Sequence, residues 1–169
     1  VGERVNAVKM NDGAVGCTMS HIRCIQIAKE RDYPHVFICE DDITFTKPEI
    51  LTDSITKFQQ TSEINWDVLI IGGNNVPPYT EVSDFCIRTF NCQTTTGYVL
   101  KKCMYDIFLG NFKESAEMLI NTGNTRMYAL DIYWKRLQSC YFWYMLTPLT
   151  VVQREDYSDI EGKNTRYDW

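Results

Sequence analysis

Three consecutive carboxylates, Glu40, Asp41 and Asp42, directly follow an apolar run and are the residues of this sequence best suited to chemistry. Like charges this close repel one another unless a cation neutralises them or a pKa rises. Carboxylate oxygens suit a hard divalent ion such as Mg²⁺ or Mn²⁺, and such ions commonly share their ligand shell with substrate phosphates. This carboxylate triplet therefore predicts a divalent-metal site, with a solvated acidic loop as the alternative.

The apolar run ahead of the triplet, residues 36–39, is expected to be the strand that positions it. A short, uninterrupted apolar run is typical of a strand buried on both faces, as in a parallel α/β sheet. Ligands bind such sheets at the carboxyl ends of the strands. We therefore expect the triplet to lie at a ligand-binding edge.

Composition favours one globular domain over residues 1–169. Hydrophobic residues make up 44% of the chain, which can therefore form a sizeable core but is too short for two ordinary domains. The net charge of −5 and the lack of a Lys/Arg cluster argue against nucleic acid as a partner. No apolar run approaches the roughly 20 residues of a membrane span.

The seven cysteines are scattered, and no two form a C-x-x-C pair. This pattern favours reduced cysteines in the core over a disulfide framework or a zinc site. The sequence also contains no N-x-[ST] acceptor for glycosylation. Both features favour a cytoplasmic protein.

Sequence periodicity predicts alternating helices and strands. Helices are expected from Gly13 to about Glu30 and from Pro48 to about Gln60, because glycine and proline commonly mark helix ends. Gly72-Gly73 is expected to end a buried strand over 65–71, where the backbone passes close to a ligand. The remaining predicted elements are helices over 104–108, 114–120 and 129–138 and strands over 85–90, 94–100 and 141–146.

Three other classes of protein with acidic motifs fit less well. A phosphoacceptor receiver domain needs an aspartate at the end of a later strand, where this sequence has Gly72-Gly73. A phosphatase of the haloacid dehalogenase type needs an aspartate nucleophile, and the longer side chain of Glu40 in that position would misplace the attacking oxygen by more than about 1 Å. An EF-hand loop needs alternating oxygen ligands, whereas this stretch becomes apolar at Ile43.

A glycosyltransferase that uses a nucleotide sugar explains the triplet better. Its leaving group is a nucleoside diphosphate, and a divalent metal stabilises the charge that grows as the bond to the sugar breaks. Under this hypothesis Asp42 and Glu40 point into one cleft. Asp42 then faces Mn²⁺ or Mg²⁺, and Glu40 faces the nucleotide or the waters on the metal.

Four segments of the sequence, in order, resemble glycosyltransferase family 25, which includes lipooligosaccharide and collagen galactosyltransferases. The segments are a glycine-containing stretch ending in Ser-His, the hydrophobic-Glu-Asp-Asp motif, a Thr-Gly-Tyr strand and a C-terminal signature, at residues 13–21, 37–43, 94–100 and 148–160. Each motif is short, but their common order makes the resemblance specific.

The resemblance implies a GT-A fold with a Rossmann-like, mostly parallel sheet flanked by helices. It also implies a UDP-hexose donor carrying galactose or glucose, Mn²⁺ or Mg²⁺, and inverting transfer to a hydroxyl of a glycan or protein acceptor. The residues expected at the donor are Ser20, His21, Asp41, Thr96 and Gly97. Family members begin with a strand and an Arg-rich turn that help to hold the nucleotide, and we expect that strand to be missing here.

Other candidates would serve the metal or the acceptor. Many GT-A enzymes close the metal site with a C-terminal histidine, which this sequence lacks. Gln153, Asp159 or water is therefore expected there instead, the alternative being a loosely held metal. Asn74 and Asn75 follow the double glycine and are expected to contact a sugar, although loop chemistry also favours asparagine at such positions.

Asp131 is the residue expected to act as the catalytic base. An inverting transfer needs a group that deprotonates the acceptor hydroxyl, and partial burial beside Leu130 and Trp134 would raise the pKa of Asp131 towards a useful value. The alternative is that Asp131 only stabilises a helix N-terminus. Similarly, His21 could be a packing residue.

The rival hypothesis for the whole chain is a non-catalytic relative that binds nucleotides or glycans.

Overall fold

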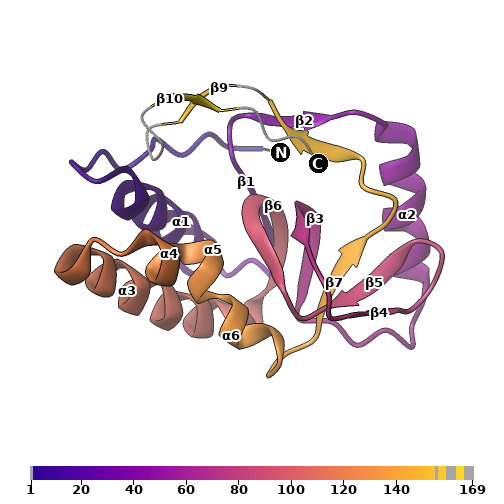
Figure 1. Cartoon of the computed structure of the whole chain (residues 1–169). Helices are drawn as coiled ribbons and strands as arrows, with labels where there is room; N and C mark the ends of the chain where they lie inside the picture. The colour runs from indigo at the N-terminus through magenta and orange to yellow at the C-terminus, as the bar shows by residue number, and fades with distance from the viewer. Residues whose placement is uncertain (1, 155, 159–162, 166–169) are drawn as a thin grey trace.

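A six-stranded sheet with strand order β1-β6-β3-β7-β5-β4 forms the centre of the computed structural model, which describes residues 2–154, 156–158 and 163–165. In that order the strands are His35–Cys39, Cys92–Lys101, Val68–Asn75, Trp143–Leu146, Cys86–Thr89 and Tyr79–Glu81. Helices lie on both sides of the sheet, as Figure 1 shows. The predicted α/β class is therefore confirmed.

The prediction of a mostly parallel sheet was wrong. Among the described strands of this sheet, β3 and β7 alone pair in parallel, whereas β1–β6, β3–β6, β5–β7 and β4–β5 are all antiparallel. The apolar run of β3 reflects burial on both faces of the sheet, since Val68 and Ile70 lie in one core cluster and Leu69 and Ile71 lie in the other, although one of its two neighbouring strands is antiparallel. Burial on both faces and parallel pairing produce the same sequence pattern, so the pattern could not separate them.

Strand β1 is an edge strand and is mostly exposed, contrary to the prediction that both its faces are buried. It pairs with β6 alone within the sheet. Ile38 is 5% exposed, whereas Phe37 is 44% exposed. The strand nevertheless ends directly before the carboxylate triplet, as predicted.

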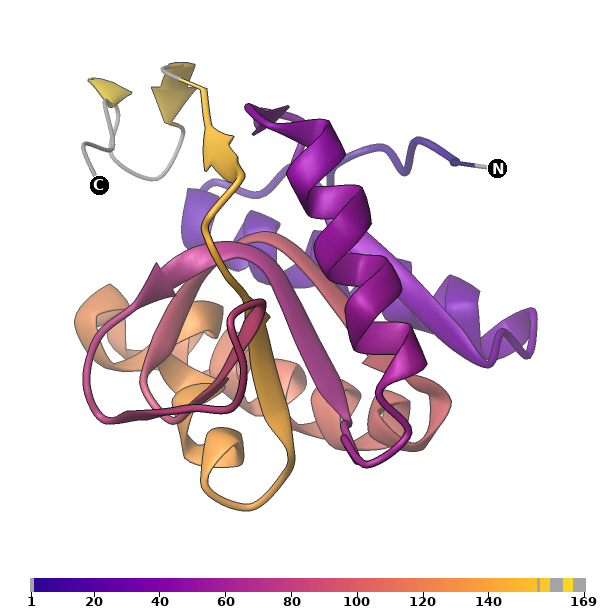
Figure 2. The same ribbon diagram turned by 90° about the vertical axis from the view of Figure 1, so that its right-hand side faces the viewer.

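Two long helices, α1 (Gly13–Glu30) and α3 (Tyr105–Thr122), pack together on one face of the sheet, and α2 (Pro48–Gln60) covers the other (Figures 1 and 2). Asp12 caps α1 because its Oδ1 accepts hydrogen bonds from the backbone N–H groups of Ala14 and Val15, at 2.8 and 3.2 Å. The predicted bounds of α1 and α2 are confirmed. No described helix is long and apolar enough to span a bilayer.

The later helices differ from the prediction. The two short helices expected over 104–108 and 114–120 are one helix, α3, preceded by the 3-10 turn η1 (Lys102–Met104). Gly110 lies within α3 without breaking it. The helix expected over 129–138 is instead two single turns, α5 (Leu130–Tyr133) and α6 (Lys135–Gln138), after a further turn, α4 (Thr125–Tyr128).

The glycine pair does not end β3, which continues through it to Asn75. A Cβ atom at Gly72 would lie 2.7 Å from Val151 Cγ1. Glycine at this position therefore allows the strand that carries Val151 to pass close above β3, rather than making room for a ligand as predicted.

That strand, β8 (Val151–Gln153), pairs antiparallel with β2 (Ile43–Phe45), the segment that follows the triplet. Gln153 is opposite Ile43 in this register. The chain continues into β9 (Asp156–Ser158) and β10 (Lys163–Thr165), which form a second two-stranded ribbon. The β2–β8 pairing thus brings a segment more than 100 residues away in sequence to the carboxylates.

All seven cysteines are unpaired, which agrees with the expectation of reduced thiols. Their location differs from the expectation of core residues. Cys86 and Cys92 are fully buried, whereas Cys39, Cys103 and Cys140 are exposed.

Candidate functional site

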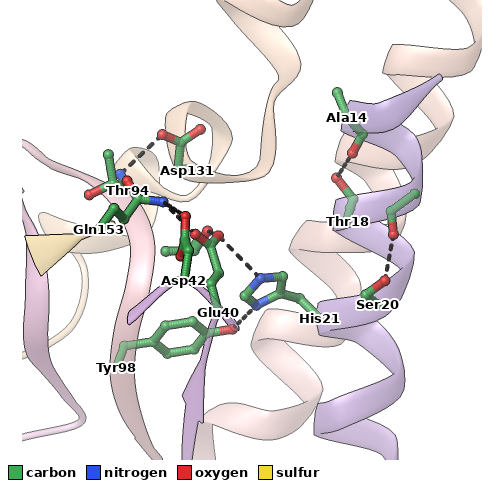
Figure 3. A network of polar contacts seen from close by, with 12 residues as sticks. Ala14, Thr18, Ser20, His21, Glu40, Asp42, Thr94, Tyr98, Asp131 and Gln153 are labelled. Atoms are coloured by element: carbon green, nitrogen blue, oxygen red, sulfur yellow. Dashed lines mark hydrogen bonds and ion pairs between the residues drawn. The ribbon is translucent and has the colours of Figure 1, made fainter. Parts of the chain in front are cut away.

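The side chains of Glu40 and Asp42 converge on one amide group. Gln153 Nε2 donates to Glu40 Oε2 at 2.7 Å and to Asp42 Oδ2 at 3.3 Å. Figure 3 shows the two carboxylates lying together, with Gln153 reaching them from one side. Asp41 lies between them in sequence and is exposed. The expected convergence of Glu40 and Asp42 is therefore present.

Glu40 is surrounded by hydrogen-bond donors. Thr95 Oγ1 donates to Glu40 Oε1 at 2.5 Å, and His21 Nε2 lies 3.8 Å from the same oxygen. Burial alone would raise the pKa of Glu40, but the contacts with His21, Thr95 and Gln153 outweigh it and lower the pKa below its usual value. Glu40 is therefore held as a carboxylate.

The pKa of Asp42 is shifted in the opposite direction from that of Glu40. Its burial, followed by repulsion from Glu40 and Asp41, raises the pKa of Asp42 to about 6. Its Oδ1 atom is buried and has no hydrogen-bond partner among the described residues. A buried, unsatisfied carboxylate oxygen is destabilising, and a bound cation would relieve it. The atoms available to bind a metal here are carboxylate oxygens, which are hard ligands, so the site fits the expected Mg²⁺ or Mn²⁺.

His21 links the triplet to the core. Its Nδ1 atom lies 2.7 Å from the hydroxyl of Tyr98, which is completely buried in β6, and the two rings stack with their centroids 5.7 Å apart. Ser20, the preceding residue, faces elsewhere: its hydroxyl donates to Gly16 O and accepts from the Val8 N–H. Of the predicted Ser-His pair, only the histidine lies at the carboxylates (Figure 3).

Asp131 lies in the first turn of α5, and its Oδ2 accepts a hydrogen bond from the Thr94 N–H at 3.0 Å. Burial raises the pKa of Asp131, and the hydrogen bond from Thr94 only partly offsets this. Thr94 has a φ of 66°, a left-handed conformation that is uncommon for threonine. The hydrogen bond therefore joins Asp131 to Thr94 of β6, the residue directly before Thr95, whose hydroxyl contacts Glu40.

The predicted sugar-binding residues of β6 are buried. Thr96 and Gly97 follow Thr95, and the Thr96 carbonyl accepts a hydrogen bond from the Glu40 N–H at 3.2 Å. A Cβ atom at Gly97 would lie 3.1 Å from Ile43 Cδ1 and 3.2 Å from Phe37 Cε2. The space beside Gly97 is thus filled by the protein's own side chains.

Asn74 and Asn75 line a groove of about 560 Å³ between the end of β3 and the β4–β5 hairpin. The Asn74 N–H donates to Thr94 Oγ1 at 3.1 Å, so Thr94 connects this groove with Asp131. Asp159, the other residue expected to close the metal site, lies outside the described residues.

Cys17 and Tyr98 also belong to this site, although neither was predicted as a site residue. Cys17, His21 and Glu40 each offer one ligand atom within 4.8 Å of the other two. The available signal was the spacing of Cys17 and His21, since residues four apart share one face of a helix. The location of Tyr98 depends on the β1–β6 register, in which it is opposite Ile38.

Comparison with known protein families gives a match. The family model described as glycosyltransferase family 25 (LPS biosynthesis protein) matches residues 2–122, well over half of the chain. The matched segment includes His21, the carboxylate triplet and Tyr98, whereas Asp131 and Gln153 lie beyond it. No match was found among curated proteins. The chain belongs to glycosyltransferase family 25.

Proposed function

We propose that this protein transfers a hexose, galactose or glucose, from a UDP-sugar to a hydroxyl of a glycan or protein acceptor, with inversion and with the help of a divalent metal. The observation that supports this most is the pairing of a stabilised carboxylate, Glu40, with Asp42, whose buried Oδ1 has no partner among the described residues. Family membership supports the glycosyltransferase class.

Asp42 and Glu40 are the residues that would hold Mn²⁺ or Mg²⁺, with the Gln153 side chain beside them. When bound, the metal would stabilise the negative charge of the departing diphosphate. Asp42 must lose its proton to act as a ligand, and its raised pKa makes that step dependent on pH. Glu40 needs no such step, because its pKa is lowered.

Asp131 is the proposed base. The acceptor oxygen attacks the anomeric carbon, the bond from that carbon to the diphosphate oxygen breaks, and the hydroxyl proton passes to the Asp131 carboxylate. A raised pKa makes the carboxylate a better proton acceptor, and the Thr94 N–H holds one of its oxygens in place. Because Asp131 contacts Thr94 in β6, its side chain does more than stabilise the N-terminus of the short turn α5.

The donor and the acceptor are proposed to lie on different sides of these residues. His21 and Asp41 flank the metal ligands. A donor-binding role for Ser20, Thr96 and Gly97 is proposed from the family resemblance alone, because the Ser20 hydroxyl bonds to the backbone within its own segment and side chains fill the space beside Gly97. The groove with Asn74 and Asn75 is the proposed acceptor side, because Thr94 connects it with Asp131. The unpaired cysteines support a reducing, cytoplasmic compartment.

UDP release from UDP-galactose and UDP-glucose, with water or an added sugar as acceptor, tests the proposal. We expect turnover with Mn²⁺, none with EDTA, and none for Asp42→Asn. Asp53→Asn is the matched control because Asp53 is exposed on α2, and this variant should keep wild-type turnover. The rival, a non-catalytic relative, predicts that UDP binds without turnover under every condition.

A further inference from the structure

A second set of potential metal ligands lies on the other side of Glu40. Cys17 Sγ, a ring nitrogen of His21 and a carboxylate oxygen of Glu40 all lie within 4.8 Å of one another. The ring nitrogen is Nε2, because Nδ1 faces Tyr98 and Nε2 lies 3.8 Å from Glu40 Oε1. Sulfur, imidazole nitrogen and carboxylate oxygen together form a ligand set that Zn²⁺ accepts.

Two well-defined elements position these ligands. Cys17 and His21 are four residues apart in the capped helix α1, so both side chains project from the same face. Glu40 follows the last residue of β1, and its backbone N–H is held by the Thr96 carbonyl. The cluster therefore does not depend on a flexible loop.

Tyr98 orients the imidazole in the way that metal-binding histidines require. A histidine that binds a metal through one nitrogen commonly bonds through the other to a neighbouring group, which fixes the ring. The Tyr98 hydroxyl lies 2.7 Å from Nδ1, and its completely buried side chain cannot turn away into solvent. Nε2 is thereby directed towards Glu40 and Cys17.

The two oxygens of Glu40 face different partners. Oε1 faces His21 and Thr95, whereas Oε2 accepts from Gln153, which also contacts Asp42. One carboxylate therefore separates a region of hard oxygen ligands around Asp42 from a region that also contains sulfur and nitrogen. Ions of different chemistry would prefer the two regions.

We propose that Cys17, His21 and Glu40 Oε1 bind a borderline divalent ion of the Zn²⁺ or Co²⁺ class, distinct from the Mg²⁺ or Mn²⁺ proposed at Asp42. Binding replaces the thiol proton of Cys17 with the metal and releases that proton to solvent. The three ligand atoms would lie at ordinary bond lengths from the metal, about 2.3 Å for sulfur and about 2.0 Å for nitrogen, with water in the fourth position. The ion enters from the side of Glu40, whose side chain is 23% exposed.

Cobalt absorption tests the proposal without any assay of transfer. The test protein carries serine in place of the exposed cysteines Cys39, Cys103 and Cys140, which removes competing surface thiols. We expect one equivalent of Co²⁺ to produce a thiolate-to-cobalt charge-transfer band, and Zn²⁺ to displace it. Cys17→Ser should abolish the band, whereas Cys24→Ser, on the same helix but outside the cluster, should retain it.

Two further variants separate this site from the proposed reaction. Asp42→Asn should keep the cobalt band even where UDP release is lost, so the two proposals can fail independently. Tyr98→Phe should weaken Co²⁺ binding by about tenfold, since loss of the group that orients a ligating histidine commonly has that effect. Absence of the band in the folded starting protein, or its persistence in Cys17→Ser, would overturn the proposal.

X-ray absorption at the zinc edge supplies a result that needs no further substitution. We expect one sulfur and two to three nitrogen or oxygen neighbours per zinc in the protein that lacks the exposed cysteines. A shell with no sulfur, or with two or more, would contradict the site even if Cys17→Ser did not fold.

Discussion

The Gln153 amide donates to Glu40 Oε2 at 2.7 Å, although the two residues are 113 positions apart in the sequence. The contact exists because β8 pairs with β2, the segment directly after the triplet, with Gln153 opposite Ile43. The family match ends at residue 122, so the C-terminal part of the chain supplies this contact from beyond the matched segment.

Gln153→Glu should make stability more dependent on metal. The substitution adds a carboxylate beside Glu40 and Asp42 and removes the amide donor, so we expect the free energy of unfolding to fall by about 1–3 kcal/mol in EDTA. Mn²⁺ should raise the melting temperature of Gln153→Glu by more than it raises that of the wild type, because a ligand that binds the folded state stabilises it. Thermal melts with and without Mn²⁺ measure this difference.

Gln59→Glu, on the exposed side of α2, is the control for an added charge. It should change neither the melting temperature nor its response to Mn²⁺ appreciably. An equal gain from Mn²⁺ in the wild type and in Gln153→Glu would contradict the proposed arrangement.

Asp42 should make the metal-free protein less stable as the pH rises. Its pKa is raised from 3.8 to about 6, so the folded state binds this proton more tightly than the unfolded chain does. The resulting stabilisation is full below pH 4 and is lost between about pH 4 and pH 6. Because Asp42 is only half-buried, we expect a loss of about 1 kcal/mol after solvent screening.

Urea unfolding of the wild type and Asp42→Asn, in EDTA at several pH values, isolates this effect as the difference between the two proteins. The difference in unfolding free energy between wild type and Asp42→Asn should change from pH 4 to pH 6 and be constant above that range. Relative to the wild type, Asp42→Asn should be more stable at pH 7 than at pH 4. Asp53→Asn should show no such dependence relative to wild type. A pH-independent difference for Asp42→Asn would show that the carboxyl titrates normally.

Asp131→Asn should remove the base while keeping the fold. The asparagine carbonyl can still accept the hydrogen bond from the Thr94 N–H, so we expect an unchanged melting temperature and unchanged UDP affinity. The transfer rate, kcat, should fall by about 10²–10⁴-fold, the usual contribution of general base catalysis.

Asp131→Ala is the informative comparison, because it removes the hydrogen bond as well. It should destabilise the protein by about 1.5–3 kcal/mol, the range for a hydrogen bond to a charged group. Wild-type turnover in Asp131→Asn would exclude Asp131 as the base.

Gly72→Ala should destabilise the protein by displacing β8. The new Cβ atom would lie 2.7 Å from Val151 Cγ1, and overpacking of this kind costs about 1–3 kcal/mol. Gly110→Ala, in α3, is the matched control because its Cβ would meet no atom within 4 Å. That change should stabilise the helix by about 0.5–1 kcal/mol. Equal stability of the two variants by urea unfolding would contradict the close passage of β8.

Local signals were sufficient to predict α1, α2 and the position of the triplet. The helices have clear ends at Gly13 and Pro48, and the triplet directly follows an apolar strand. These features depend on residues that are neighbours in sequence. The same applies to the spacing of Cys17 and His21, which was visible in the sequence although no role was assigned to it.

Features set by tertiary contacts could not be predicted in the same way. Strand direction depends on how β6 inserts between β1 and β3, and the exposure of Phe37 follows from the edge position of β1. Gly72 was interpreted as the end of a strand because β8, its actual neighbour, is distant in sequence. Gln153 lies at the carboxylates, but the β2–β8 register that places it there had no local signal in the sequence.

Calorimetric titration of UDP tests the central proposal, a metal-dependent donor site at Glu40 and Asp42, most directly. Wild-type protein should bind UDP at least about tenfold more tightly with Mn²⁺ than with EDTA, a difference of about 1.4 kcal/mol. Asp42→Asn should lose this difference, and Asp53→Asn should retain it. Equal UDP affinity with Mn²⁺ and with EDTA in the wild-type protein would contradict the account.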